Sequence, residues 1–210
     1  MTSATLYARS TSAPSTRPWR TWRDHRAGGA SALEGSATSL ASRVREAALL
    51  EGDFVLSSGR RSRFYVDKYL FSTEPGLLRD LARGLSAKLP EGVAKLAGVE
   101  LGAVPLVAAT ALETGLPYVI VRKGTKDYGA NAGRAIEGRL VAGEKVVLVE
   151  DVVTTGTQVL RAAEVLEGEG TEIAGIVAVL DRREERTPRL GPYPFEALLG
   201  LQDLGLKKGH

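Results

Sequence analysis

The sequence predicts an α/β fold with a central, mostly parallel sheet flanked by helices. Short apolar segments that favour strands alternate with amphipathic segments of about 10 to 15 residues that favour helices, which is the pattern of a parallel sheet covered on both faces. The segment Val146–Val149 is hydrophobic without alternation, as a strand buried on both sides requires. Polar residues follow several of these strands, so we expect a binding crevice at the carboxyl end of the sheet.

The elements are expected in the following order. An amphipathic helix runs from Thr38 to Gly52, and a strand, a glycine turn and a second strand occupy Asp53–Lys68. Pro75 suits the first turn of the next helix. The remaining expected elements are strand Lys95–Val99, a helix through about Glu113, strand Pro117–Val121, the strand from Val146 with its helix, strand Ile173–Leu180 and a short strand Phe195–Leu199.

Composition excludes several classes of function. The chain has 210 residues, 43% of them hydrophobic, which suffices for one globular domain with a sizeable core. It has no cysteine and two histidines, His25 and His210, so we expect no disulfide, no thiolate site and no Ser-His-Asp triad. Apolar runs all fall short of the roughly 18 residues that a membrane-spanning helix needs, so no membrane partner is expected.

The net charge of +3 belongs to the N-terminal segment. Residues 1–40 hold five arginines and two acids, which leaves 23 of the 28 basic and 23 of the 25 acidic residues for the rest. The folded part therefore has no basic excess with which to bind nucleic acid. Residues 1–37, rich in Ser, Thr, Ala, Gly and Arg, predict a disordered basic extension, and residues 38–210 the folded domain. A transit peptide and a start codon assigned too early are alternatives for the extension.

The segment Val146–Gln158 carries the strongest functional signal. Its apolar strand is expected to end at two adjacent carboxylates, Glu150 and Asp151, and a small-residue turn, Thr154–Thr157, leads into a helix. Backbone N–H groups in such a turn, and at the start of a helix, form a site for phosphate. The two acids suit a neutral diol or a divalent metal beside that phosphate, and ribose 5-phosphate has both a phosphate and a diol. A plain strand-to-helix turn capped by threonine is the alternative interpretation.

The segment E-D-V-V-T-T-G-T resembles the phosphoribosyl-pyrophosphate (PRPP) motif of the type I phosphoribosyltransferases. Three other segments resemble the orotate phosphoribosyltransferases in particular: S-S-G-R-R-S-R-F-Y-V-D, R-K-x-x-K-x-x-G and V-L-D-R. The resemblance covers roughly residues 40 to 205. It implies a type I phosphoribosyltransferase-like fold with a small N-terminal hood segment and a flexible catalytic loop. It also implies a cytoplasmic homodimer with shared active sites that uses Mg²⁺.

The resemblance assigns roles to individual residues. It implies that Lys126 and Asp151 are catalytic, and that Mg²⁺ is carried by PRPP and pyrophosphate rather than by an assigned protein ligand. The orotate-binding residues would be Tyr65, Val66, Thr154 and Arg182. The PRPP-binding residues would be Arg122, Lys123, Lys126, Glu150, Asp151, Val152, Val153, Thr154, Thr155, Gly156, Thr157 and Gln158.

The segment Arg122–Leu140 is too long and too rich in glycine for a passive connection. We interpret it as a lid whose cations stabilise the departing pyrophosphate; a solvated charged loop is the alternative. The chain departs from the family at three positions. Tyr128 replaces a histidine common in that loop, and Leu101 and Ser57 each replace a lysine that many members carry.

The sequence thus predicts an enzyme that transfers ribose 5-phosphate from PRPP to orotate, giving orotidine 5′-monophosphate and pyrophosphate. A phosphoribosyltransferase for a purine base would share the PRPP motif but not the N-terminal segment. A non-catalytic PRPP-sensing regulator on the same fold would need a nucleic-acid-binding element, which the neutral folded part does not offer.

Overall fold

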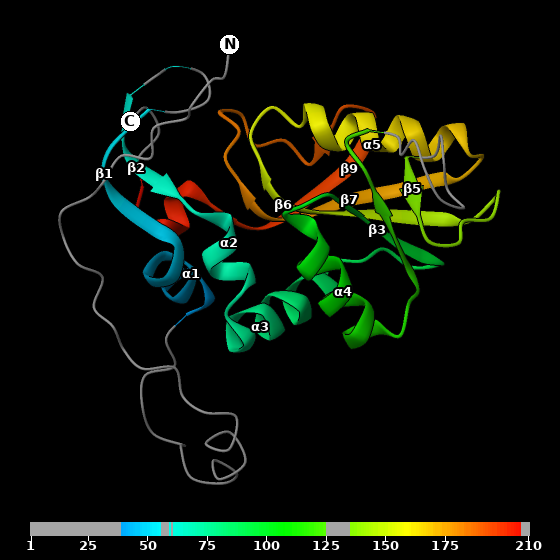
Figure 1. The fold of residues 1–210 in the computed structure, drawn as a ribbon, viewed down its shortest axis with the longest axis horizontal. Coiled ribbons are helices and arrows are strands. Elements are labelled where there is room, and N and C mark those ends of the chain that lie inside the picture. Colours follow the sequence, from blue (N-terminus) through cyan, green and yellow to red (C-terminus); the bar gives the residue numbers. More distant parts are fainter. Residues whose placement is uncertain (1–38, 56–58, 60, 125–134, 207–210) are drawn as a thin grey trace, which may run out of the picture. The chain divides into compact units, whose positions relative to one another are not determined.

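A seven-stranded sheet forms the centre of the protein in a computed structural model, which describes residues 39–55, 59, 61–124 and 135–206. The strand order is β5-β4-β3-β6-β7-β9-β8, and the five inner strands run parallel (Figure 1). The short strands β5 and β8 pair antiparallel at the two edges. The strands are β3 (Lys95–Val99), β4 (Tyr118–Val121), β5 (Ile136–Glu137), β6 (Lys145–Val153), β7 (Glu172–Asp181), β8 (Arg189–Leu190) and β9 (Tyr193–Gly200).

Helices cover both faces of this sheet. Helix α5 (Thr157–Gly168) lies on one face, and α3 (Pro75–Ser86) and α4 (Ala103–Thr114) lie on the other (Figure 1). Pro75 occupies the first turn of α3, as expected, because that position needs no backbone donor. A 3₁₀ helix, Leu201–Leu204, follows the last strand. Among the helices of the described ranges, none is long and apolar enough to cross a membrane.

The central strand β6 shows why both faces are needed. Val146 and Leu148 pack into the hydrophobic cluster beneath α5, and Val147 and Val149 pack into the cluster beneath α3 and α4. All four side chains are fully buried. Successive side chains of a strand point to opposite faces, so an uninterrupted apolar run fits only a strand covered on both sides. The predicted α/β class with a mostly parallel sheet is confirmed.

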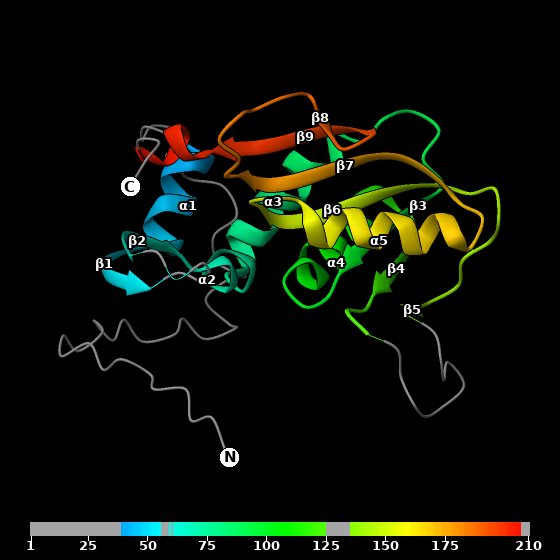
Figure 2. The same cartoon turned by 90° about the horizontal axis from the view of Figure 1, so that it is seen from above.

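A hairpin and two short helices precede the sheet. The hairpin consists of β1 (Leu49–Val55) and β2 (Arg61–Val66), and it lies at one end of the sheet (Figures 1 and 2). Helix α1 (Leu40–Ala48) comes before it and α2 (Lys68–Ser72) after it.

Two predicted boundaries in this region are wrong. The first helix ends at Ala48 rather than Gly52, because Leu49 to Glu51 pair with β2. The second strand ends at Val66 rather than Lys68, because the side chain of Asp67 accepts a hydrogen bond from the Tyr69 N–H and so caps α2. Residues 1–37 lie outside the described ranges, so their prediction as a disordered extension stays a prediction.

Candidate active site

A cavity of about 460 Å³ opens where β6 leads into α5. The hairpin contributes one side of the wall and the strand-to-helix connection the other, so segments about 85 residues apart in the sequence meet here. The walls carry twelve of the predicted substrate residues together with Lys68, Val159 and Arg161, which the sequence did not single out for the site. The predicted residues on the wall are Tyr65, Val66, Glu150, Asp151, Val152, Val153, Thr154, Thr155, Gly156, Thr157, Gln158 and Arg182.

The two acids lie within β6 and not at its end, which corrects the predicted end of the strand. Pairing with β3 stops at Val149, but β6 continues alongside β7 as far as Val153. The Oδ1 atom of Asp151 accepts the Val152 N–H at 2.5 Å, and Glu150 Oε1 accepts the Asp151 N–H at 3.1 Å. The side chains of both acids therefore accept hydrogen bonds from the backbone of β6 itself. They lie in the part of β6 that no longer pairs with β3.

Burial gives the acid pair unusual electrostatics. Glu150 is 9% exposed and Asp151 1% exposed, and Glu150 Oε2 is buried without a hydrogen-bond partner among the described residues. Burial and, second, the charge of Asp151 raise the pKa of Glu150 far above its ordinary value, because two carboxylates so close cannot both ionise easily. An oxygen without a hydrogen-bond partner can accept a bond from a hydroxyl group or, when the carboxyl group is protonated, donate one.

Lys68 compensates the charge of this acid pair. Its Nζ lies 2.8 Å from Asp151 Oδ2. Burial acts to lower the pKa of Lys68, but the hydrogen bond and charge of Asp151, with Glu150, outweigh it and the pKa is raised. Gly102 leaves room for the carboxylate, since a Cβ there would stand 1.6 Å from Asp151 Oδ2. A sequence pattern could reveal neither residue, because both contacts arise from tertiary packing.

The turn Thr154–Thr157 has the character of an anion site. Among the described residues, no protein group accepts a hydrogen bond from the backbone N–H of Thr154, Thr155 or Gly156. The Thr155 and Thr157 hydroxyls lie 2.9 Å apart, and α5 begins at Thr157. These donors and the positive end of the helix together favour a phosphate group.

Glycine is required within this turn. Gly156 has φ +78°, and a Cβ on it would approach Leu190 Cδ1 to 2.6 Å. Both the left-handed backbone and the contact with β8 exclude a side chain.

The cavity wall also includes an arginine and two hairpin residues, Tyr65 and Val66. The Arg182 N–H donates to the Val153 carbonyl at 2.8 Å, which brings Arg182 next to the turn. Its half-buried guanidinium has no ion-pair partner among the described residues, since Asp181 is paired with Arg183. Burial lowers the pKa of Arg182, although Tyr65 opposes this. Such a guanidinium suits the carboxylate of a ligand.

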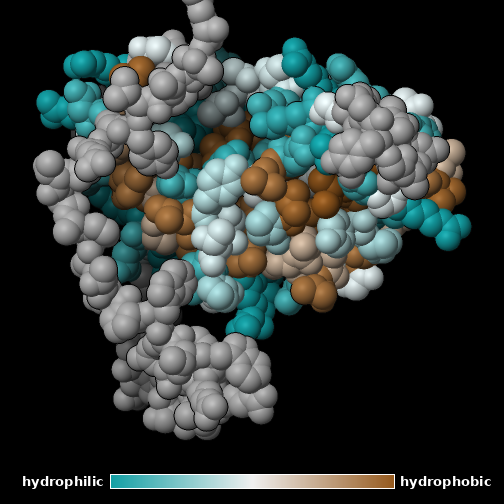
Figure 3. All heavy atoms as spheres, in the orientation of Figure 1, coloured by the Kyte–Doolittle hydropathy of each residue, from teal (hydrophilic) through white to brown (hydrophobic). Residues whose placement is uncertain are grey.

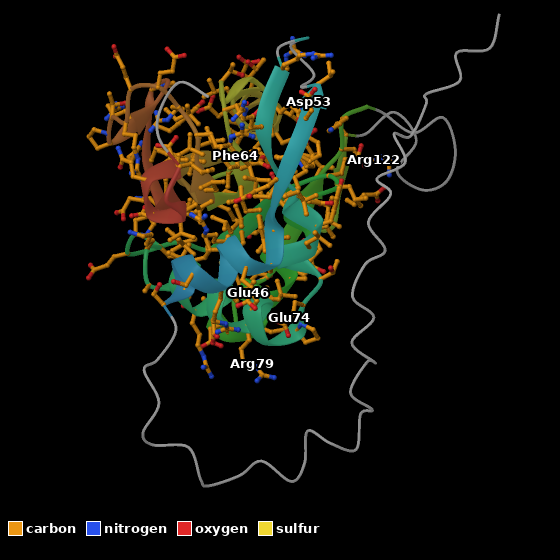
Figure 4. The ribbon with its side chains drawn as sticks, turned by 90° about the vertical axis from the view of Figure 1, so that its left-hand side faces the viewer. Glu46, Asp53, Phe64, Glu74, Arg79 and Arg122 are labelled. Carbon is orange, nitrogen blue, oxygen red and sulfur yellow. The ribbon has the colours of Figure 1, made fainter. Side chains whose placement is uncertain are left out.

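Arg122 and Lys123, the described cations at the start of the predicted lid, are not among the residues that line this cavity. Arg122, at the end of β4 (Figure 4), lies 3.7 Å from Glu137 and 4.0 Å from Glu100. The backbone N–H of Lys123 donates to Glu100 Oε1 at 2.7 Å. Both residues are therefore held beside Glu100 rather than at the cavity. The predicted catalytic Lys126, as well as Tyr128 and Ser57, falls outside the described ranges.

Within the described part of the chain, no group of three His, Cys, Asp or Glu side chains could hold a metal ion. The two acids of β6 are the carboxyl groups that line the cavity. They fit a hard cation that arrives with a ligand which supplies its remaining oxygens.

Comparison with known sequences agrees with the family resemblance found in the sequence motifs. A sequence model of the Phosphoribosyl transferase domain matches residues 75–193. The orotate phosphoribosyltransferase of Natronomonas pharaonis is 50% identical over 145 residues, which span 69% of this chain and 82% of that protein.

Solved structures agree with the sequences. The orotate phosphoribosyltransferase of Mycobacterium tuberculosis in complex with Fe(III) dicitrate has a TM-score of 0.67 and 33% identity, covering 80% of this chain and 97% of the other. The same enzyme in complex with PRPP has a TM-score of 0.61 and 31% identity, covering 80% and 97%. With a family model over more than half of its length and a relative at half identity, this chain belongs to the orotate phosphoribosyltransferase family.

Proposed function

We propose that the protein transfers the ribose 5-phosphate group of PRPP to N1 of orotate, giving orotidine 5′-monophosphate and pyrophosphate in pyrimidine biosynthesis. The observation that carries the proposal is the cavity, in which three kinds of group converge. Unpartnered amides of the Thr154–Gly156 turn suit the 5′-phosphate, the acid pair suits the ribose diol, and Arg182 suits the orotate carboxylate.

In this proposal, catalysis consists of positioning and charge stabilisation. The turn Thr154–Gln158 anchors the phosphate, and Asp151 and Glu150 hold the diol while positive charge develops on the ribose ring. Tyr65 and Val66 border the base, and Arg182 orients it with N1 toward the sugar. Arg122, Lys123 and Lys126 are proposed to meet the pyrophosphate, with Lys126 as the catalytic cation of the loop.

We propose Mg²⁺ as the metal, carried by the pyrophosphate oxygens of the substrate. The cavity fits such a cation, because its acids are too few for a protein-only cage but lie beside the proposed ribose. When bound, the ion would neutralise the negative charge of the pyrophosphate.

The family resemblance also supports a cytoplasmic homodimer with shared active sites. Exposed apolar side chains, among them Leu112 at 89% and Leu101 at 64%, offer surface for a second copy. On the face shown in Figure 3, hydrophobic residues form several separate areas between hydrophilic ones. The molar mass by light scattering, at the concentration used for activity, tests this assembly; the mass of one chain would contradict it.

The reaction is tested by incubating the pure protein with PRPP, Mg²⁺ and one base at a time: orotate, uracil, adenine, hypoxanthine or xanthine. We expect pyrophosphate release with orotate. Release with a purine but not with orotate would replace the proposed substrate by a purine base. Binding of PRPP without turnover of any base would favour a regulator.

A further inference from the structure

Lys68 lies at a junction that fixes its position. It is the first residue of α2 and is separated from the hairpin strand β2 by Asp67 alone. The side chain of Asp67 accepts a hydrogen bond from the Tyr69 N–H, and this cap sets the direction in which the chain enters the helix. From there its side chain, 36% exposed, reaches Asp151, whose side chain is 2% exposed. The ammonium thus bridges the hairpin and the central strand across the cavity wall.

The surroundings of Asp151 hold one counter-charge. Within the described ranges, Lys68 is the one cation paired with either acid of β6, while Glu150 faces Asp151 from the same strand and Gly102 faces it from the loop before α4. Removal of the cation would leave a buried carboxylate uncompensated beside a second carboxyl group. The bond from Val152 N–H holds Oδ1 of Asp151, and the ion pair with Lys68 at 2.8 Å is the charged contact of Oδ2 among the described residues.

We propose that Lys68 is a positioning residue for the sugar-binding part of the cavity. Lys68 orients Asp151 and balances its charge, so that the carboxylate can accept hydrogen bonds from the hydroxyl groups of a ribose diol. The inference rests on the proposed function, which places the diol at Asp151. A carboxylate accepts hydrogen bonds only, and the diol hydroxyls donate them, so the orientation and charge of Asp151 decide how well the sugar is held.

The test measures PRPP binding by calorimetry in the absence of a base, using the full chain. The variant Lys68→Met should weaken PRPP binding about tenfold or more, the worth of one charge-assisted hydrogen bond, and Lys68→Arg should restore most of it. The matched control is Lys88→Met, which removes an ion pair of 2.7 Å with Glu196 away from the cavity and should leave binding unchanged. Wild-type affinity in Lys68→Met would overturn the proposal.

A double-mutant cycle separates positioning from direct contact. If Lys68 acts through Asp151, then Lys68→Met should cost little further affinity in an Asp151→Asn background. A full, additive loss there would overturn the positioning role, because it would mean that Lys68 touches the ligand itself.

Inorganic phosphate gives a second readout, since it lacks the diol. Lys68→Met should weaken ribose 5-phosphate but not phosphate, and an equal loss for both would indicate a distorted site and overturn the proposal. The outcome is independent of the base: a wild type that binds PRPP but does not turn over orotate contradicts the proposed substrate alone. Normal PRPP binding by Lys68→Met with intact turnover contradicts the Lys68 role alone.

Discussion

At the scale of single residues, the guanidinium of Arg182 should set the affinity for the base. It faces the cavity without an ion-pair partner among the described residues. Replacing it by methionine should raise the KM for orotate about tenfold or more, because a charged hydrogen bond to the orotate carboxylate is lost, while the KM for PRPP changes much less. Steady-state kinetics with each substrate varied in turn measures both.

The matched control for that change is Arg79→Met, at an exposed arginine on α3 (Figure 4). It removes the same charge and should leave both KM values unchanged. An equal rise of the two KM values in Arg182→Met would contradict a role at the base end of the cavity.

Gly156 should be irreplaceable for phosphate binding. Alanine there must adopt φ +78° and push against Leu190, so we expect a loss of stability of about 1–3 kcal/mol and loss of PRPP binding. Gly115→Ala isolates the backbone part, because Gly115 has φ +74° but nothing within 4 Å of a Cβ, and the further loss in Gly156→Ala is the steric part. Urea denaturation and calorimetry compare the two. Unchanged PRPP binding in Gly156→Ala would show that the turn is not the phosphate site.

At the scale of elements, one buried lysine joins the start of β3 to the end of the predicted lid and to Glu144 beyond it. Lys95 Nζ donates to Glu144 at 2.6 Å and to the Arg139 carbonyl at 2.6 Å. Glu144 also accepts the Val141 N–H at 2.9 Å. Burial acts to raise the pKa of Glu144, but the hydrogen bonds from Lys95 and Val141, with the charges of Lys95 and Arg139, together outweigh it and the pKa is lowered.

Breaking this tie should destabilise the fold more than breaking a surface pair. Lys95→Met leaves a carboxylate without its cation and should cost about 3–5 kcal/mol of unfolding free energy. Lys145→Met, which removes an exposed pair with Glu172, should cost about 1 kcal/mol or less. Equal midpoints in urea for the two variants would contradict a structural role for Lys95.

The elements that the sequence predicts well are those whose signal is local. The apolar runs of β3, β6 and β7 and the proline of α3 are found in the structure at or near their expected places. The end of β6 was wrong because β7 continues to pair with it after β3 has ended, which depends on a partner strand. The short edge strand β8 has too few residues for any pattern.

The same distinction applies to the site. Glu150 to Gln158 form one contiguous motif, so the phosphate turn and the acids could be predicted. The roles of Lys68 and Gly102 could not, because each meets Asp151 only after the hairpin and the loop before α4 have packed against β6.

At the scale of the whole molecule, the strand order explains where the cavity lies. From β3 the chain adds β4 on one side, and from β6 it adds β7 and β9 on the other, so the order reverses between β3 and β6. Helix α4 follows β3 on one face of the sheet and α5 follows β6 on the other (Figure 2). The loops that lead into α4 and α5 therefore turn to opposite faces between β3 and β6. Ligands of open α/β sheets bind at such a point. Gly102 and Asp151 meet at this place.

A site built from buried acids should also affect the stability of the whole protein as the pH changes. Burial and, second, the charge of Asp151 raise the pKa of Glu150 from 4.5 to about 8. The folded protein therefore keeps a proton that the unfolded chain releases. This contribution to stability is complete below about pH 4.5 and is lost as the pH rises through the folded value, with a limiting slope of about 1.4 kcal/mol per pH unit.

Glutamine at position 150 cannot titrate, so the comparison with Glu150→Gln reports the proton held by the acid pair, because groups away from the pair titrate alike in both proteins. We expect the unfolding free energy of the wild type, relative to Glu150→Gln, to decline between about pH 4.5 and about pH 8 and then level off. Urea denaturation at several pH values measures the difference. The exposed Glu46 on α1 (Figure 4) provides the matched control, since Glu46→Gln makes the same exchange outside the cavity. A constant difference for Glu150→Gln would mean that Glu150 is already ionised at neutral pH, and that the acid pair carries its full charge into the cavity.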